Sequence, residues 1–183
     1  MVATPVETQR PLRRAEYDTL VASGAFADER IELLDGALAP MSPIAPPHSS
    51  AVQKLTELLL PALLGRATVR VQSPFAALEL SEPEPDLAVV PPGDYDEAHP
   101  HRAYLIIEVA ESSLLLDRTR KSAIYATSGV PEYWIGNLSE RCIEVYSNPE
   151  GAAYVAARRV EHSEALHPAA FPELELRVAD VLK

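Results

Sequence analysis

Cysteine is almost absent from this sequence of 183 residues, in which Cys142 is the only one. A single cysteine excludes an internal disulfide, which suits a reducing compartment. Cys142 falls in a segment with strand character, where a cysteine packs as a small apolar residue and makes a poor nucleophile. We therefore expect no catalytic role for Cys142.

Long hydrophobic runs are missing as well. No apolar stretch approaches the roughly 20 residues that a membrane-spanning helix needs. The segment from Met1 to Arg14 carries charges without the apolar run of a secretory signal behind them. These absences argue against a membrane helix and a secretory signal, and we expect a cytoplasmic protein with no membrane partner.

Positive charge is scarce, since 16 lysines and arginines stand against 27 aspartates and glutamates, for a formal net charge of -11. A protein that neutralises many phosphates normally carries a basic surface, and this chain as a whole does not. Its basic residues do cluster locally, at Arg10, Arg13 and Arg14, at Arg118, Arg120 and Lys121, and at Arg158 and Arg159. Such clusters usually form solvated faces, although a basic strip on an acidic body stays open.

The rest of the composition is that of an ordinary globular protein, with 47% hydrophobic and 23% charged residues. A chain of this length can bury a sizeable core. We expect one domain over residues 1–183, with its core at about residues 31–146.

The first part of the chain predicts two helices and a hairpin. Apolar residues at helical spacing favour helices over residues 14–22 and 48–64. Between them, short strands at residues 31–34 and 37–41 flank Asp35-Gly36, a turn whose residues tolerate positive φ.

Strand signals follow at residues 69–72, 75–80, 87–90 and 105–110. The last two are continuous apolar runs, which are typical of strands covered on both faces. We therefore expect these two strands in the middle of a sheet.

The second half predicts a helix and then an antiparallel meander. Asp117 stands in the position of an N-cap for a helix over residues 118–128, which Gly129 ends. The remaining elements are predicted as strands at residues 132–135, 143–146 and 154–160, a last strand near 174–176 and a tail helix at 178–182.

Three charged residues in the middle third are candidate site residues. Asp86 precedes one apolar run, Glu108 lies inside the next, and Lys121 lies on the predicted helix. Stepping about 100° per residue places Lys121 on one helical stripe with Asp117 and Tyr125, on the apolar face. Because buried charges are costly without partners, we expect Lys121 to meet the two carboxylates.

If the two strands are neighbours, the carboxylates of Asp86 and Glu108 converge. Two carboxylates with waters are a ligand set that Mg²⁺ accepts, and the cation leaves room for a substrate phosphate. Each residue also has a structural interpretation: Asp86 as a turn residue, Glu108 with Lys121 as an ion pair, and Lys121 as a side chain that reaches solvent. The pattern alone leaves both interpretations open.

The same residues carry a resemblance to a known family. In chain order, the matching positions are residues 32–36, Ser42-Pro43, His48, Pro85-Asp86, residues 106–112, Asp117, Lys121, Tyr125 and residues 129–134. Together they resemble the Uma-type family of restriction endonucleases, a bacterial branch of the PD-(D/E)xK nuclease superfamily that is expanded in cyanobacteria. The resemblance spans roughly residues 31–145.

The resemblance implies an α/β fold with a restriction-endonuclease-like core: a central mixed β-sheet flanked by helices, with an N-terminal hairpin and a C-terminal antiparallel meander. It implies that Asp86, Glu108 and the backbone carbonyl of Val109 bind Mg²⁺, with Mn²⁺ as a substitute. Lys121 would steady the attacking water or the phosphate charge. DNA is the implied substrate, and a homodimer is the implied assembly.

Glu32, His48 and Tyr125 are secondary candidates near this site. We interpret Glu32 as a charged hairpin position that faces solvent, and His48 as a residue that caps the start of a helix. The chain also departs from the usual pattern in two places. Ala110 stands where the superfamily usually has its lysine, so activity depends on Lys121. Ser113 replaces a usual proline, which changes the loop after the second strand.

Two functions stay open. The leading hypothesis is a Mg²⁺-dependent endonuclease that hydrolyses DNA phosphodiester bonds. The alternative is a catalytically silent homo-oligomeric module that keeps the nuclease fold and binds a protein partner through its acidic surface. Zinc binding by His99 and His101 is disfavoured, because two histidines without a nearby cysteine do not close a tetrahedral site.

Overall fold

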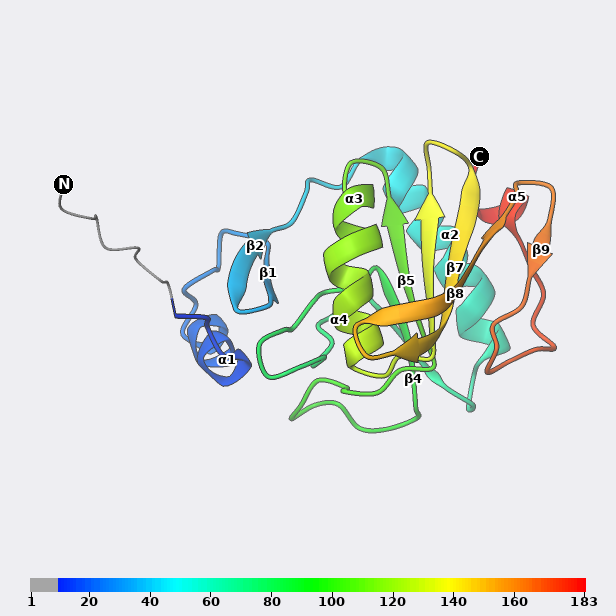
Figure 1. Ribbon diagram of the computed structural model, residues 1–183. Coiled ribbons are helices and arrows are strands. Elements are labelled where there is room, and N and C mark those ends of the chain that lie inside the picture. The colour runs from blue at the N-terminus through cyan, green and yellow to red at the C-terminus, as the bar shows by residue number, and fades with distance from the viewer. Residues whose placement is uncertain (1–9) are drawn as a thin grey trace.

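The structure is a computed structural model, and it describes residues 10–183. The expectation that the N-terminus carries no secretory signal concerns mainly residues 1–9, which lie outside the described residues. Figure 1 shows a central sheet with helices on both faces, and beside it a short helix and a two-stranded hairpin. None of the helices within residues 10–183 is both long and apolar enough to cross a membrane.

In the described residues, the main sheet has six strands in the order β3-β4-β5-β6-β7-β8. These strands are β3 Thr68–Val71, β4 Leu87–Val90, β5 Leu105–Ala110, β6 Glu132–Asn137, β7 Cys142–Glu150 and β8 Ala153–Val160. β5 and β6 are parallel, whereas the other neighbouring pairs are antiparallel. The sheet is therefore mixed, and the predicted meander β6-β7-β8 forms one half of it.

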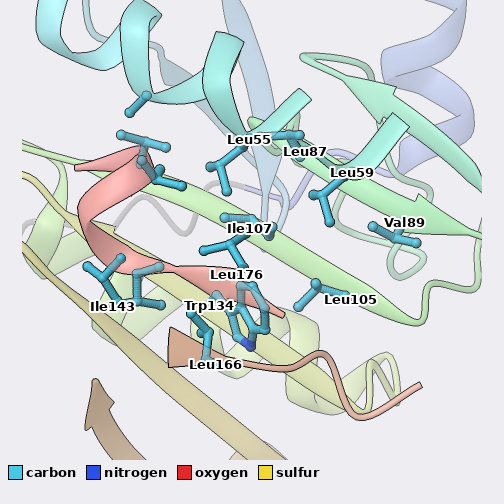
Figure 2. Close-up of a cluster of buried hydrophobic side chains, with 14 of the residues drawn as sticks. Leu55, Leu59, Leu87, Val89, Leu105, Ile107, Trp134, Ile143, Leu166 and Leu176 are labelled. Carbon is cyan, nitrogen blue, oxygen red and sulfur yellow. The ribbon is translucent and has the colours of Figure 1, made fainter. Parts of the chain in front are cut away.

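Every residue of β4 and β5 is buried, because helices cover both faces of the sheet. On one face, α2 (Pro46–Ala62) packs Leu55 and Leu59 against the strands. Figure 2 shows these leucines in one cluster with Leu87, Val89, Leu105 and Ile107. The continuous apolar runs of the two strands follow from this double covering.

The opposite face is covered by one helical run made of α3 (Leu114–Leu116), η1 (Asp117–Lys121) and α4 (Ser122–Thr127). Tyr125 packs there with aromatic and aliphatic residues of the sheet, among them Ile106 and Tyr133. Its ring centroid lies 5.0 Å from that of Tyr133. This helical run holds Lys121 over the ends of β4 and β5.

The N-terminal elements are α1 (Arg14–Ala22) and the hairpin of β1 (Ile31–Leu34) and β2 (Ala37–Pro40). The predicted turn is confirmed, since Asp35 has φ 46° and Gly36 has φ 76°. Backbone hydrogen bonds join Leu33 to Glu82 in both directions and fix the hairpin beside the segment that leads into β4. The hairpin is thereby placed next to Asp86.

The C-terminal elements cover the edge of the sheet face on which α2 packs. They are β9 (Ala165–Leu166), β10 (Leu176–Arg177) and α5 (Val178–Val181). Leu166, Leu176 and Val178 join the apolar cluster on that face. The predicted last strand and tail helix are both present.

The predicted strand over residues 75–80 is wrong. The backbone N–H of Phe75 donates to the carbonyl of Pro83, whereas that of Ala76 donates to Pro100, and Leu78 pairs with Ser81 in a local bridge. Hydrogen bonds that lead to different neighbours cannot form a continuous ladder. The segment is a structured loop despite its apolar sequence.

The predicted N-cap role of Asp117 is also wrong, because the helical run begins at Leu114. Leucines are strong helix formers and extend the run by a turn toward the N-terminus. Asp117 instead begins the π-helical turn, and its side chain accepts a 2.6 Å hydrogen bond from Ser113 Oγ. Turns of this kind are frequent at functional sites.

Candidate active site

Asp86 and Glu108 lie side by side because of the register of β4 and β5. Leu87 is paired with Ile107, so the residues just outside this pair fall next to each other. The amide of Val109 donates to Asp86 Oδ2 at 2.8 Å, and the amide of Asp86 lies 3.4 Å from Glu108 Oε2. The convergence expected from the sequence is present.

Lys121 extends from η1 into the space between these carboxylates and the hairpin. Its Nζ lies 3.1 Å from Glu108 Oε1 and 3.1 Å from Glu32 Oε2, and the residue is 5% exposed. Burial alone would lower the pKa of Lys121, but the carboxylates of Glu108 and Glu32 outweigh it and raise that pKa. These contacts favour the charged form of Lys121.

Glu108 accepts a second hydrogen bond, from Tyr125 Oη to Oε1 at 2.7 Å. Burial raises the pKa of the Glu108 carboxyl well above its usual value, and the charge of Lys121 opposes that rise. Tyr125, a secondary candidate, thus holds one oxygen of Glu108 in place.

Glu32 does not face solvent, so that interpretation is wrong. It is 3% exposed, and its Oε2 also accepts the amide of Glu84 at 3.1 Å. The hairpin packs against the segment before β4, and this contact covers the side of β1 that a free hairpin would expose. Glu32 thereby becomes a second partner of Lys121.

His48 does not cap α2, which begins at Pro46 with Ala45 as its N-cap. The Nε2 atom of His48 instead lies 3.0 Å from Asp86 Oδ2. Gln72 Nε2 donates to Asp86 Oδ1 at 3.3 Å. The Asp86 carboxylate is therefore held from both sides.

Gln72 and Asp117 are site residues that sequence reasoning missed. Gln72 has φ 42°, and nothing in the sequence marks a glutamine for that conformation. Asp117 is 1% exposed, and burial raises its pKa to about 6. Asp117 lies on one helical stripe with Lys121 and Tyr125, and this spacing is the feature of the sequence that could have identified it as a site residue.

Asp86, Glu108 and Lys121 line a cavity of about 110 Å³, together with Glu32, His48, Gln72 and Asp117. The loop over residues 40–45 lines it as well. Arg30 and Lys121 are the cationic side chains in its lining, which also includes His48. The acidic side chains outnumber them: Glu32, Glu84, Asp86, Glu108, Glu111 and Asp117. The cavity therefore carries an excess of negative charge.

The donor set fits a Mg²⁺ ion. Within residues 10–183, no three histidine, cysteine, aspartate or glutamate side chains form a ready-made metal cage. Mg²⁺ needs none, because it keeps several waters and often takes only one or two carboxylates. Asp86 and Glu108 offer hard oxygen ligands, Val109 lines the same cavity, and the surplus of buried carboxylates favours a bound cation.

Comparison with known proteins identifies the fold and the family of this chain. A crystal structure of a "putative nuclease belonging to DUF820" from Anabaena variabilis ATCC 29413 superimposes with a TM-score of 0.73 at 15% sequence identity. The match covers 93% of this chain and 97% of that one, so the two share their fold. No curated protein sequence matches this chain. The family model described as "Uma2: Putative restriction endonuclease" matches residues 14–179, and the chain therefore belongs to that family.

Proposed function

We propose that this protein is a Mg²⁺-dependent endonuclease that hydrolyses DNA phosphodiester bonds in the cavity that holds Asp86, Glu108 and Lys121. The observation that carries the proposal is the buried contact of Lys121 with Glu108, next to Asp86, in the lining of that cavity. Phosphodiester hydrolysis needs oxygen ligands for a cation and a fixed positive charge near the phosphate, and these residues supply both.

Asp86, Glu108 and the backbone carbonyl of Val109 would hold the cation, and we expect Mn²⁺ to replace Mg²⁺ there. When bound, the cation lowers the pKa of a coordinated water and offsets phosphate charge. The surroundings support this role, because His48 orients Asp86 and Tyr125 orients Glu108.

Lys121 supplies the positive charge of the chain itself. An ammonium group has three donors, of which Glu32 and Glu108 can take two. The third is left for a phosphate oxygen, whose charge grows in the transition state. Glu32 is a positioning residue in this proposal, since it acts on the substrate through Lys121.

The acidic character of the chain shapes how DNA binds. A net charge of -11 opposes the sequence-independent attraction that most DNA-binding proteins use. We therefore expect tight DNA binding only when the divalent cation is present. The homodimer and the cytoplasmic location stay predictions.

Cleavage assays with single-stranded, double-stranded and branched DNA test the proposal. Native protein should cleave at least one of these with Mg²⁺ or Mn²⁺ and none with EDTA. Lys121→Ala should lower the rate about 100-fold or more. Lys54→Ala, which removes a lysine of α2 that donates to the carbonyl of Val181, is the matched control and should cleave normally.

The alternative of a silent homo-oligomeric module makes the opposite prediction. It requires an oligomer in light scattering and no Mg²⁺ site in a calorimetric titration. Absence of metal binding at millimolar concentrations, or equal cleavage by native protein and Lys121→Ala, would overturn the proposed function.

A further inference from the structure

A second, larger cavity of about 590 Å³ lies beside the candidate active site and shares only Arg30 and Glu84 with it. Its walls come from α1 and the turn after it, from the segment Glu82–Glu84, and from the loop between Tyr95 and His99. Small-molecule pockets in proteins typically measure about 300–1,000 Å³. This cavity has the size of a ligand site, and the proposed hydrolysis makes no use of it.

Aromatic rings form part of its lining. Tyr17 and Phe26 stack with their centroids 5.9 Å apart and their planes 26° apart. Tyr95 lines the cavity as well, with the Arg70 guanidinium already 5.6 Å from its ring centroid on one face. Aromatic faces attract cations through the ring quadrupole. The walls therefore suit a flat or alkyl group that carries positive charge.

The charge of the lining also favours a cationic ligand. The cationic side chains are Arg14 and Arg30, and Arg30 is already paired with Glu84 at 2.5 Å. The acidic side chains are Asp18, Glu29, Glu82, Glu84, Asp96 and Glu97. A phosphate or a carboxylate ligand would be repelled by this surplus.

Glu82 is the residue that most needs a partner. It is 5% exposed, lines the cavity, and has no salt bridge to any basic side chain within residues 10–183. The group beside it is Asp18, another acid. Burial, followed by the charge of Asp18, raises the pKa of Glu82 to about 7, while Arg14 opposes the rise. A carboxyl that is buried beside a second acid is costly to ionise, and a bound cation would lower that cost.

We propose that this cavity binds a small organic cation with an amidinium or guanidinium group, which pairs with Glu82 and Asp18 and lies against the aromatic rings. A metal ion suits the cavity less well. The aromatic rings in its walls offer apolar surface that an organic cation would contact and a hydrated metal ion would not.

Benzamidine and its neutral isostere benzamide test the site on the full chain by calorimetry. Native protein should bind benzamidine at least tenfold more tightly than benzamide, since benzamide is neutral and has a carbonyl oxygen in place of one NH₂ donor. Glu82→Gln should weaken benzamidine binding at least tenfold. Glu150→Gln removes the same charge from the exposed end of β7 and should leave binding unchanged. Equal weakening in both variants, or equal binding of both compounds, would overturn the proposal.

A second variant guards against misfolding of Glu82→Gln. Asp18 lies on the exposed side of α1, so Asp18→Asn should fold normally and weaken benzamidine binding severalfold.

Agmatine and a blocked arginine peptide distinguish two sources of the cation. Tighter binding of agmatine indicates a free metabolite, whereas tighter binding of the peptide indicates a partner's side chain. Failure of both agmatine and peptide to compete with benzamidine would contradict the proposal. None of these readouts depends on DNA cleavage.

Discussion

Lys121 Nζ lies 3.1 Å from Glu108 Oε1, and both side chains are almost completely buried. The two residues come from a helix and from the central strand of the sheet on which that helix packs. A buried ion pair contributes little net stability, but removing one partner leaves an uncompensated charge. Replacing either residue alone should therefore destabilise the protein.

Replacing one member of this pair should destabilise the fold more than replacing both. We expect Lys121→Met to lower the free energy of unfolding by about 3–5 kcal/mol, because Glu108 and Glu32 then lack a counter-charge. The double variant Lys121→Met with Glu108→Gln should recover part of this loss. Urea unfolding of the native, single and double variants measures the coupling. If the loss of unfolding free energy in the double variant equals the sum of the losses in the two single variants, the two residues do not interact directly.

Glu82 makes stability depend on pH. Its pKa is raised to about 7 in the folded protein, with burial as the main cause, Asp18 adding to it and Arg14 opposing it. Because a raised pKa means that the folded state binds the proton more tightly, this group reduces stability as pH rises from about 4.5 to about 7. Glu82→Gln should therefore stabilise the protein by on the order of 1–2 kcal/mol at pH 8 and have little effect at pH 4.

Urea unfolding of native protein and Glu82→Gln at both pH values checks the sign. Glu150→Gln serves as the control for removal of one negative charge from the exposed surface. A stabilisation by Glu82→Gln that is equal at pH 4 and pH 8 would show that titration of Glu82 is not its cause.

The centre of the site could be predicted from the sequence, because its position depends on local patterns. Continuous apolar runs place β4 and β5 in the middle of the sheet, with Asp86 just before one run and Glu108 inside the other, and the pairing of these two strands brings the residues together. The helical period then brings Lys121 to the same face as Tyr125. Short-range patterns are enough to select these residues, and only the pairing of the two strands had to be assumed.

The surroundings of the site could not be predicted, since they depend on contacts between distant segments. Glu32 is buried by the packing of a hairpin on the chain before β4, a contact that the local pattern of β1 does not encode. His48 reaches Asp86 across 38 residues. The apolar segment 75–80 has strand composition but no strand alongside it, so tertiary hydrogen bonds override its local preference.

His48 should affect metal affinity without being a ligand. Its contact with Asp86 orients a carboxylate that would bind the cation, and outer partners of this kind typically change metal affinity by about 10–100-fold. We expect His48→Ala to weaken Mn²⁺ binding by this factor in a calorimetric titration. His101→Ala removes an exposed histidine and should bind Mn²⁺ as the native protein does. Equal affinities for native protein and His48→Ala would contradict the positioning role.

Gly36 and Gly65 provide a matched test of how the hairpin is attached to the rest of the protein. Both have positive φ, at 76° and 75°, so an alanine at either position adopts a disfavoured backbone conformation. The added methyl group would lie 2.3 Å from Cβ of Pro11 at Gly36, whereas it would meet nothing within 4 Å at Gly65. Only Gly36 is therefore crowded.

We expect Gly65→Ala to lower the free energy of unfolding by about 1 kcal/mol, and Gly36→Ala to lower it by roughly 1–3 kcal/mol more. The extra loss arises because the turn must move away from Pro11, which also strains the hydrogen bond from the amide of Gly36 to Leu80. The same movement displaces β1 and loosens the contact of Glu32 with Lys121. Gly36→Ala should consequently lower the rate of DNA cleavage, whereas Gly65→Ala should not. Equal stability and equal cleavage in the two variants would show that the attachment of the hairpin does not control the position of Lys121.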